Sequence, residues 1–314
     1  MAARELVVLG TASQVPTRTR NHNGYVLRLD DQLVLLDPGE GTQRQLTLAG
    51  VAAVRLTRIC LTHGHGDHCF GLPGVLSRIA LDSQQEGAPA HEVPLHFPAA
   101  AQAQVHALRF AAGAGDGAPG RVLDEPVHGD GVLADGPWRV VARELDHRVP
   151  AVGYRFEEPG GRRLLAHELA ARGVSGPAVR ELVDVGRLEV DGCWVELAEV
   201  SEPRAGQVVA HVMDTRPCDG ALALAAGADL LVIEATYLHR DRQLAAQYGH
   251  LTARQAAQIG RDAGARRVVL THFSQRYGDG EEFTRAYLEE ARAVHPDVVL
   301  ARDLDRIPLP PRRP

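Results

Sequence analysis

The stretch Thr62-His63-Gly64-His65-Gly66-Asp67-His68 decides the fold of this chain. It brings three imidazoles and one carboxylate together within six residues, directly after the apolar run Ile59-Cys60-Leu61, which is typical of the end of a buried strand. Imidazole and carboxylate ligands favour zinc, with manganese or iron as alternatives. The stretch therefore predicts a metal-binding loop. The plain alternative is a histidine-rich surface loop.

Length and composition are those of an ordinary globular enzyme. The chain has 314 residues, of which 45% are hydrophobic and 24% charged, so it can bury a large core. The net charge is −6, and all 34 basic residues are arginine. Binding of a nucleic acid would therefore depend on local patches and metal ions, because the overall field repels phosphate.

The compartment is expected to be the cytoplasm. No apolar run is long enough to span a membrane, so we expect no membrane partner. The first residues lack the apolar region of a signal peptide. The four cysteines are scattered without a CxxC pair, which is typical of reduced thiols.

Short apolar runs between turn residues predict an α/β (α+β) fold. The expected strands cover residues 6–9, 25–29, 33–36, 93–97, 138–145, 208–213, 230–233 and 268–270. The expected helices cover 71–82, 102–110 and 253–263, and a capping box of Thr252 and Gln255 opens the last of them. Residues 1–314 are expected to form one domain with an inserted arm at 154–205, in which 162–190 is expected to be helical.

Four apolar runs lead into histidine or aspartate, at His63, His147, Asp214 and His272. Sites in open α/β sheets form beyond the carboxyl ends of strands, so these side chains should converge if the strands share an edge. The full candidate set is His63, His65, Asp67, His68, His147, Asp214 and His272. Seven ligands exceed the usual four of one zinc and suit two metals, with Asp214 as a bridge. Two such metals activate water near neutral pH, which indicates a hydrolase. Each strand-end residue taken alone could also be an ordinary polar end of a strand.

The metal-binding stretch matches the signature of the metallo-β-lactamase fold superfamily, and the chain as a whole resembles the ribonuclease Z family of tRNA 3′-endonucleases. The second resemblance rests on motifs that extend from near the start to residue 277: Pro16–Asn21, Asp37–Gln43, Leu145–Pro150, Gly173–Pro177, Met213–Arg216, Glu234–Thr236, His250–Thr252 and Leu270–Tyr277. Asp37 is expected either to brace the metal loop or to be a plain turn acid.

The resemblance implies a four-layer αββα sandwich, two Zn²⁺ ions per subunit, and a homodimer. It implies hydrolysis of precursor tRNA after the discriminator base, which leaves a 3′-hydroxyl on the tRNA. By analogy, one zinc is held by His63, His65 and His147, and the other by Asp67, His68 and His272, with Asp214 between them. Asp67 would also accept the proton of the attacking water. His250, supported by Glu234, would donate a proton to the leaving oxygen; the alternative is a loop histidine that packs on the next helix.

The substrate contacts implied by the resemblance are Arg276 at the site and Gly176, Pro177, Arg172 and Arg180 in the arm. A surface arginine is the alternative for Arg276. Between Arg155 and Arg204 the chain carries seven arginines against ten acids, an unusual balance for an RNA clamp. The alternative function is therefore a small-molecule hydrolase with the same site, such as a phosphodiesterase, arylsulfatase or lactonase. A non-catalytic metal- or RNA-binding relative is a third class, against which the complete ligand set argues.

Overall fold

The computed structural model describes residues 4–85, 92–113 and 122–313. The chain divides into two compact units. Unit 1 comprises residues 1–156 and 208–310, and unit 2 comprises residues 157–207 with the end of the chain from Pro311. Unit 2 overlaps the segment 154–205 that was expected to be an inserted arm, and it also includes the end of the chain. Among the helices of the described residues, none combines the length and apolar character that crossing a membrane requires.

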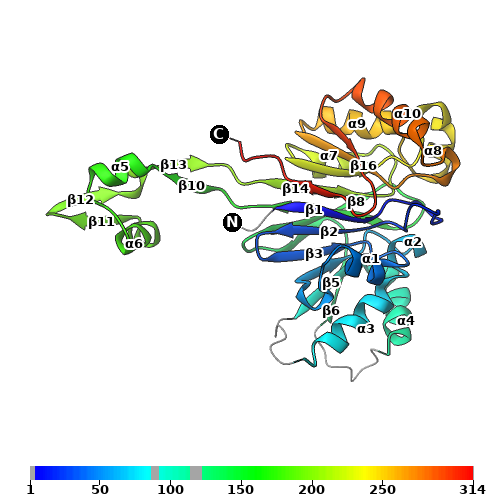
Figure 1. Cartoon of the computed structure of the whole chain (residues 1–314), viewed down its shortest axis with the longest axis horizontal. Coiled ribbons are helices and arrows are strands. Elements are labelled where there is room, and N and C mark those ends of the chain that lie inside the picture. The colour runs from blue at the N-terminus through cyan, green and yellow to red at the C-terminus, as the bar shows by residue number, and fades with distance from the viewer. Residues whose placement is uncertain (1–3, 86–91, 114–121, 314) are drawn as a thin grey trace. The chain divides into compact units, whose positions relative to one another are not determined.

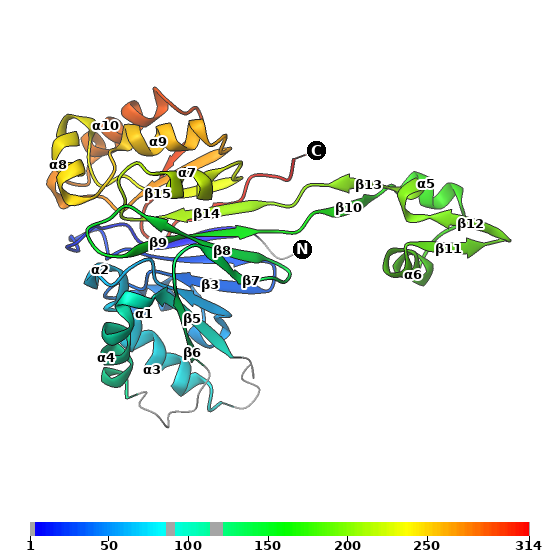
Figure 2. The ribbon, with the colours of Figure 1, turned by 180° about the vertical axis from the view of Figure 1, so that it is seen from behind.

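The described part of unit 1 contains two seven-stranded sheets (Figure 1). The first has the order β18 (Arg306–Pro308), β1 (Glu5–Gly10), β2 (Gly24–Leu29), β3 (Gln32–Leu36), β4 (Arg58–Cys60), β5 (Val93–Pro98) and β6 (Val122–Val127). The second has the order β17 (Val298–Leu300), β16 (Arg267–Thr271), β15 (Leu230–Glu234), β14 (Val208–Val212), β9 (Ala151–Glu157), β8 (Arg139–Leu145) and β7 (Gly131–Ala134), and its far edge is visible in Figure 2.

Helices cover the outer face of each sheet (Figure 1). Those on the first sheet are α1 (Thr42–Leu48), α3 (Leu72–Asp82) and α4 (Gln102–Ala111). Those on the second are α7 (Asp219–Ala225), α9 (Ala253–Asp262) and α10 (Glu281–Arg292). Two further helices, α2 (Gly66–Cys69) and α8 (Arg242–Tyr248), are short and lie next to the candidate site.

Three hydrophobic clusters lie between these four layers, one between each pair of neighbouring layers. Strand β1 illustrates the rule, since successive side chains of a strand point to opposite faces of the sheet. Leu6 and Val8 belong to the cluster between the two sheets, whereas Val7 and Leu9 pack toward the helices of the first sheet. A third cluster lies between the second sheet and its helices. The expected four-layer αββα sandwich is therefore confirmed.

Unit 2 is built from short strands as well as helices. It contains β10 (Gly161–Leu164), α5 (Ala166–Ala171), α6 (Pro177–Val185), β11 (Arg187–Val190), β12 (Cys193–Glu196) and β13 (Ser201–Arg204). The expectation of a helical segment over 162–190 was wrong at both ends. Strand β10 pairs with β13, and β11 pairs with β12 across a turn at Asp191 and Gly192, which both have positive φ. An Asp-Gly turn between alternating residues is a hairpin signal that outweighs helical periodicity.

Candidate metal centre

The candidate site forms where strand ends from both sheets of unit 1 meet. The metal-binding loop follows β4, and His147 follows β8. Asp214 and His272 follow β14 and β16, and both have positive φ, 43° and 61°. Non-glycine residues rarely adopt this left-handed conformation, and such strain concentrates at functional sites. The structure thus turns these two side chains out of their strands toward a common point.

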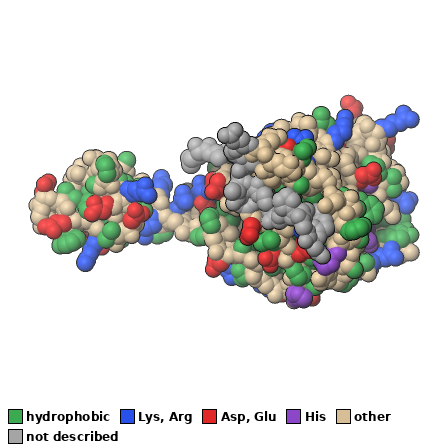
Figure 3. All heavy atoms as spheres, turned by 90° about the horizontal axis from the view of Figure 1, so that it is seen from below, with side chains coloured by type: hydrophobic (Ala, Val, Ile, Leu, Met, Phe, Trp, Pro, Cys, Tyr) green, Lys and Arg blue, Asp and Glu red, His purple; other side chains and the backbone are tan. Residues whose placement is uncertain are grey.

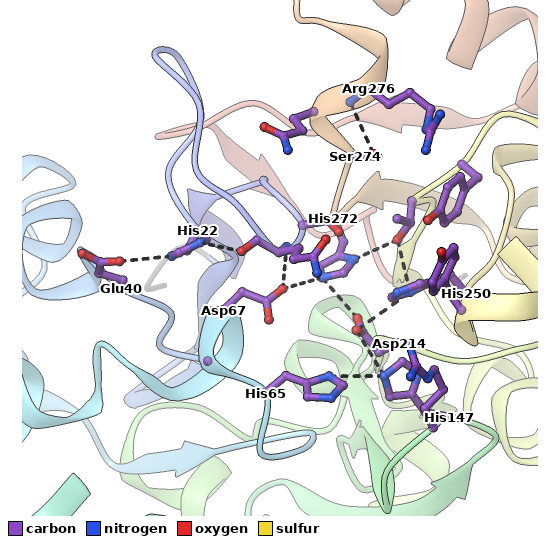
Figure 4. A pocket seen from close by; sticks show the side chains of 18 of the residues that line it. His22, Glu40, His65, Asp67, His147, Asp214, His250, His272, Ser274 and Arg276 are labelled. Carbon is purple, nitrogen blue, oxygen red and sulfur yellow. Dashed lines mark hydrogen bonds and ion pairs between the residues drawn. The ribbon is translucent and has the colours of Figure 1, made fainter. Parts of the chain in front are cut away.

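The seven predicted ligands lie together as two adjoining groups. Their ligand atoms lie within 4.8 Å of one another in each group, which comprise His63, His65, His147 and Asp214, and Asp67, His68 and His272. The imidazole nitrogens Nε2 of His63 and Nδ1 of His65 are 2.9 Å apart, and Nε2 of His68 and Nε2 of His272 are 3.2 Å apart. Figure 4 shows His65 and His147 on one side of Asp214, and Asp67 and His272 on the other.

Asp214 connects the two groups through its two oxygens. Its Oδ2 lies 3.5 Å from Nε2 of His63 and 3.7 Å from Nε2 of His147. Its Oδ1 lies 3.4 Å from Nε2 of His68 and 3.2 Å from Nε2 of His272. Within the described part of the chain, this buried Oδ1 has no hydrogen-bond partner. A carboxylate that offers one oxygen to each group has the arrangement that a metal bridge requires.

The histidines are oriented by hydrogen bonds from the ring nitrogen that faces away from the site. Nδ1 of His147 donates to the carbonyl of Gly249 at 2.8 Å, and Nδ1 of His272 donates to Oγ1 of Thr236 at 2.9 Å. Nδ1 of His63 contacts Oγ1 of Thr62 at 3.1 Å. Nδ1 of His68 faces Asp37 at 3.1 Å. For these four histidines Nε2 faces the centre, which is how metal-bound histidines are usually held, whereas His65 presents Nδ1.

The electrostatics of the centre fit a divalent cation. Burial lowers the pKa of His63, His65 and His147, so these imidazoles are neutral, as ligands must be. Burial also opposes charge on His68, but Asp214, Asp67 and Asp37 outweigh it and raise its pKa well above the ordinary value. Burial opposes ionisation of Asp214, yet the imidazoles around it hold its pKa well below the usual range. The point that these groups share therefore favours positive charge.

Asp37 braces the metal loop from behind, which resolves the two alternatives left by the sequence. Its carboxylate accepts hydrogen bonds from the amide of Thr62 at 2.7 Å and from Oγ1 of Thr62 at 2.9 Å. It also contacts His68 and, at 3.2 Å, Nε2 of His211, and all four residues are fully buried. Asp37 follows β3 with a φ of 47°, another left-handed residue at a strand end.

His250 and Glu234 form a buried pair at the edge of the centre. Nδ1 of His250 lies 3.1 Å from Oε1 of Glu234, while Oε2 of Glu234 accepts from Oγ1 of Thr236 at 2.6 Å. Burial lowers the pKa of His250, but Glu234, with help from Asp214, outweighs burial and raises it to about 9. His250 is therefore a cation near neutral pH. It could also join Asp214 and His272 as a ligand, but its bond to Glu234 suits a proton donor better.

A cavity of about 1070 Å³ opens over the centre. Arg276 lines it, beside Ser274 at the upper end of Figure 4. The side chains of Arg276 and Arg148 are exposed, and neither forms an ion pair with another described residue. The cavity lies just above the range of about 300–1000 Å³ for small-ligand sites, so it is large for a site that binds one small molecule.

The four predicted arm contacts belong to unit 2. Gly176 has a φ of 59° and caps α6, which Pro177 opens. Arg172 pairs with Glu168, and Arg180 lies 3.7 Å from Asp184. On the face of unit 2 that Figure 3 shows, arginine and acidic side chains are interspersed. On that face the arginines form no continuous basic surface.

Several residues of the centre were not identified from the sequence. His211 supports Asp37, Thr236 links Glu234 to His272, and the carbonyl of Gly249 orients His147. His211 lies within a strand, where an isolated histidine reads as ordinary core polarity. The carbonyl of Gly249 carries no side-chain signal at all. Thr236 alone belongs to a motif on which the resemblance rests, Glu234–Thr236, and this motif is the usable hint.

Comparisons with known proteins agree with this geometry. The family model described as the metallo-beta-lactamase superfamily matches residues 17–167, and the beta-lactamase superfamily domain matches residues 196–273. The chain is 53% identical over 318 residues to ribonuclease Z of Streptomyces coelicolor and 54% identical over 315 residues to ribonuclease Z of Nocardia farcinica, with full coverage of every chain. The crystal structure of human tRNase Z, short form, aligns with a TM-score of 0.66 and 27% identity, covering 98% of this chain and 99% of that one.

Family membership and the donor set together indicate a divalent-metal centre in a metal-dependent hydrolase. The predicted resemblance is confirmed by relatives with about half of their residues identical across the whole length. This chain belongs to the ribonuclease Z family of the metallo-β-lactamase superfamily.

Proposed function

We propose that this chain is a zinc-dependent endoribonuclease that removes the 3′ trailer of precursor tRNA, acting as a cytoplasmic homodimer. The observation that carries the proposal is the division of the Asp214 oxygens between two ligand groups, with the Glu234–His250 pair beside them. That arrangement suits a reaction in which charge develops on a phosphoryl group and a proton must reach the leaving oxygen.

Two zinc ions would be held by His63, His65 and His147 on one side and by Asp67, His68 and His272 on the other, with Asp214 between them. When bound, the ions would supply Lewis acidity toward the phosphate and a water of lowered pKa. Asp67 faces the cavity, and its Oδ2 is held 2.7 Å from the amide of Gln14. This anchoring aims the carboxylate that would take the proton of the attacking water.

Hydrolysis after the discriminator base breaks the bond between phosphorus and the 3′-oxygen of that nucleotide. Water attacks phosphorus, and Asp67 accepts its proton. The cationic His250 donates a proton to the departing 3′-oxygen, and the phosphate remains on the trailer. Glu234 acts through His250, since it keeps that imidazole protonated. Arg276 would contact a phosphate of the bound RNA, while Gly176, Pro177, Arg172 and Arg180 would contact the tRNA from the arm.

A cleavage assay on precursor tRNA with a 3′ trailer tests this proposal. Zinc-loaded protein should cut next to the discriminator base, and Asp67→Ala should not. Asp262→Ala, in which an exposed acid of α9 is removed, is the matched control and should retain full activity. Metal analysis should give two zinc ions per chain, and light scattering should give a dimer.

The alternative of a small-molecule hydrolase has a distinct signature in the same assay. Bis(p-nitrophenyl) phosphate would be turned over while precursor tRNA remains intact. The interspersed charges of unit 2 are the observation that favours this alternative. Cleavage of both substrates supports the endoribonuclease.

A further inference from the structure

Exposed aromatic side chains are scarce in this protein, and half of them lie at the metal centre. Aromatic residues make up only 4% of the chain. Among the described residues, four aromatic side chains are exposed, at Phe70, Phe110, Trp194 and Tyr248. Phe70 and Tyr248 line the cavity over the centre. Their side chains are 56% and 39% exposed, so folding leaves much of each ring in water.

Phe70 is held in place although it is exposed. It follows α2 directly, and its amide donates to the carbonyl of Gly66 at 2.9 Å. A Cβ atom at Gly66 would lie 2.4 Å from Cε2 of the ring, so glycine at this position lets the ring edge lie against the backbone of the metal-binding loop. One edge of the ring therefore rests on the loop that carries Asp67, and the rest remains available to a ligand.

Tyr248 is the corresponding residue from the other half of unit 1. It ends α8 and precedes Gly249, whose carbonyl orients His147. The guanidinium carbon of Arg148 lies 5.9 Å from the centre of its ring. Phe70 thus follows Asp67 in the chain with two residues between them. Tyr248 is next to Gly249, whose carbonyl accepts a hydrogen bond from His147. A phosphodiester alone provides no partner for either ring.

We propose that Phe70 and Tyr248 each stack on a nucleobase and so position the two nucleotides that flank the scissile phosphate. The inference rests on the proposed endoribonuclease function and names the substrate groups that the site recognises. Every base has a π-face, so stacking on an aromatic side chain tolerates any sequence. An enzyme that cuts many tRNAs at one position requires contacts that are independent of base identity, and stacking provides them.

Abasic substrates separate stacking from a structural effect. Three precursor tRNAs would be compared: the intact one, one without the base 5′ to the cut, and one without the base 3′ to it. Phe70→Ala should lower kcat/KM on the intact substrate by about 10- to 100-fold, the range expected for loss of one base–aromatic stack. On the substrate that already lacks the stacked base, the same substitution should cost less than about threefold. Tyr248→Ala should behave alike with the other abasic substrate.

Conservative and distant variants complete the design. Phe70→Tyr and Tyr248→Phe keep an aromatic ring and should retain activity within about threefold. Phe110→Ala removes an exposed aromatic of α4 outside the cavity and should change nothing. Zinc content and oligomeric state would be measured for every variant and should equal those of the wild type.

The outcomes distinguish this inference from the function on which it rests. Failure of the wild type to cut precursor tRNA would remove the endoribonuclease function itself. Normal cutting by the wild type, with equal losses for Phe70→Ala on all three substrates, would overturn stacking alone. A changed oligomeric state with base-independent losses would assign the rings to contact with a second copy instead, and would also overturn the proposal.

Discussion

The metal centre and the arm hold their polar side chains very differently. Asp214 is 2% exposed and is enclosed by imidazoles from several strand ends. The side chain of Arg180 in the arm is 88% exposed, and its acidic neighbour Asp184 comes from the same helix. Substitution of a buried carboxylate would leave the charged groups around it uncompensated. An exposed ion pair, in contrast, contributes little to stability. The candidate metal centre therefore lies in the packed core of unit 1, while the proposed tRNA contacts of the arm lie on an exposed surface.

The largest expected effect is loss of the shared carboxylate. Asp214→Ala should remove both metal ions and lower kcat by about 10³-fold or more, since metal charge stabilisation is worth several kcal/mol. His65→Ala touches only one group and should retain the other ion. Metal analysis with kinetics checks both variants. Retention of two ions by Asp214→Ala would contradict the bridging arrangement.

Removal of the arm tests the contribution of the second region to the cleavage of precursor tRNA. Since Gly161 pairs with Arg204, residues 162–203 can be replaced by an Asn-Gly turn that joins these two paired residues. We expect kcat/KM on precursor tRNA to fall roughly 100-fold, with a weaker salt dependence, because phosphate contacts are lost. Turnover of bis(p-nitrophenyl) phosphate should stay unchanged. Equal loss on both substrates would mean that the arm supports the centre itself.

Removal of the negative charge of Asp37, which braces the metal-binding loop, should have the next largest effect. Asp37→Asn retains the shape of the side chain but weakens its hold on Thr62 and His68. Metal affinity should fall about 10- to 100-fold, as for other residues that orient metal ligands. Titration with zinc measures it. Asp31→Asn, an exposed acid in the turn after β2, is the matched control and should bind metal normally.

The Glu234–His250 pair predicts a change in pH dependence. Glu234 raises the pKa of His250, so Glu234→Gln should lower it. A proton donor must be protonated, so activity is lost as pH rises through its pKa, and the falling alkaline limb of kcat should move to lower pH. Each unit of displacement lowers kcat on that limb by about tenfold. If the alkaline limb of kcat does not move in Glu234→Gln, a group other than His250 donates the proton to the leaving oxygen.

The smallest effect is expected from single arginines of the arm. Arg172→Ala and Arg180→Ala should each change kcat/KM on precursor tRNA by less than about threefold, because both are paired on the surface. Arg276→Ala, in the cavity and without an ion pair among the described residues, should cost about tenfold for one charge-assisted phosphate contact. If Arg180→Ala lowers kcat/KM on precursor tRNA more than Arg276→Ala does, the main phosphate contact lies in the arm and not in the cavity.

Much of the centre was predictable because metal chemistry leaves a dense pattern in the chain. His63, His65, Asp67 and His68 are adjacent in sequence, and the remaining ligands follow apolar runs that had to be strands. The residues that orient them were less visible. His211 lies in the middle of β14, and its role depends on packing against Asp37 from another sheet. Phe70 and Tyr248 read as ordinary apolar residues until their exposure is known.

The arm was the least predictable region. Its small buried cluster of Leu169, Val174, Leu182, Val195 and Val200 imposes weak periodicity, and the pattern over 162–190 predicts helix where the chain forms short strands at both ends. Charge counting showed that the arm is not basic. It could not show which arginines are paired, because the pairs of Arg163 with Glu202 and of Arg172 with Glu199 join distant positions in sequence.

The sequence by itself determined the fold superfamily and the seven candidate ligands, because metal binding requires particular residue types after strand-like runs, whereas His250 and Glu234 were expected as proton donor and partner only from the resemblance. Only the tertiary structure decided that the two oxygens of Asp214 serve separate ligand groups, that Asp37 and His211 support His68, and that the exposed rings of Phe70 and Tyr248 line the cavity. Those relations depend on distances between strands from two sheets. No local pattern encodes such distances, since they arise only when the apolar faces pack together.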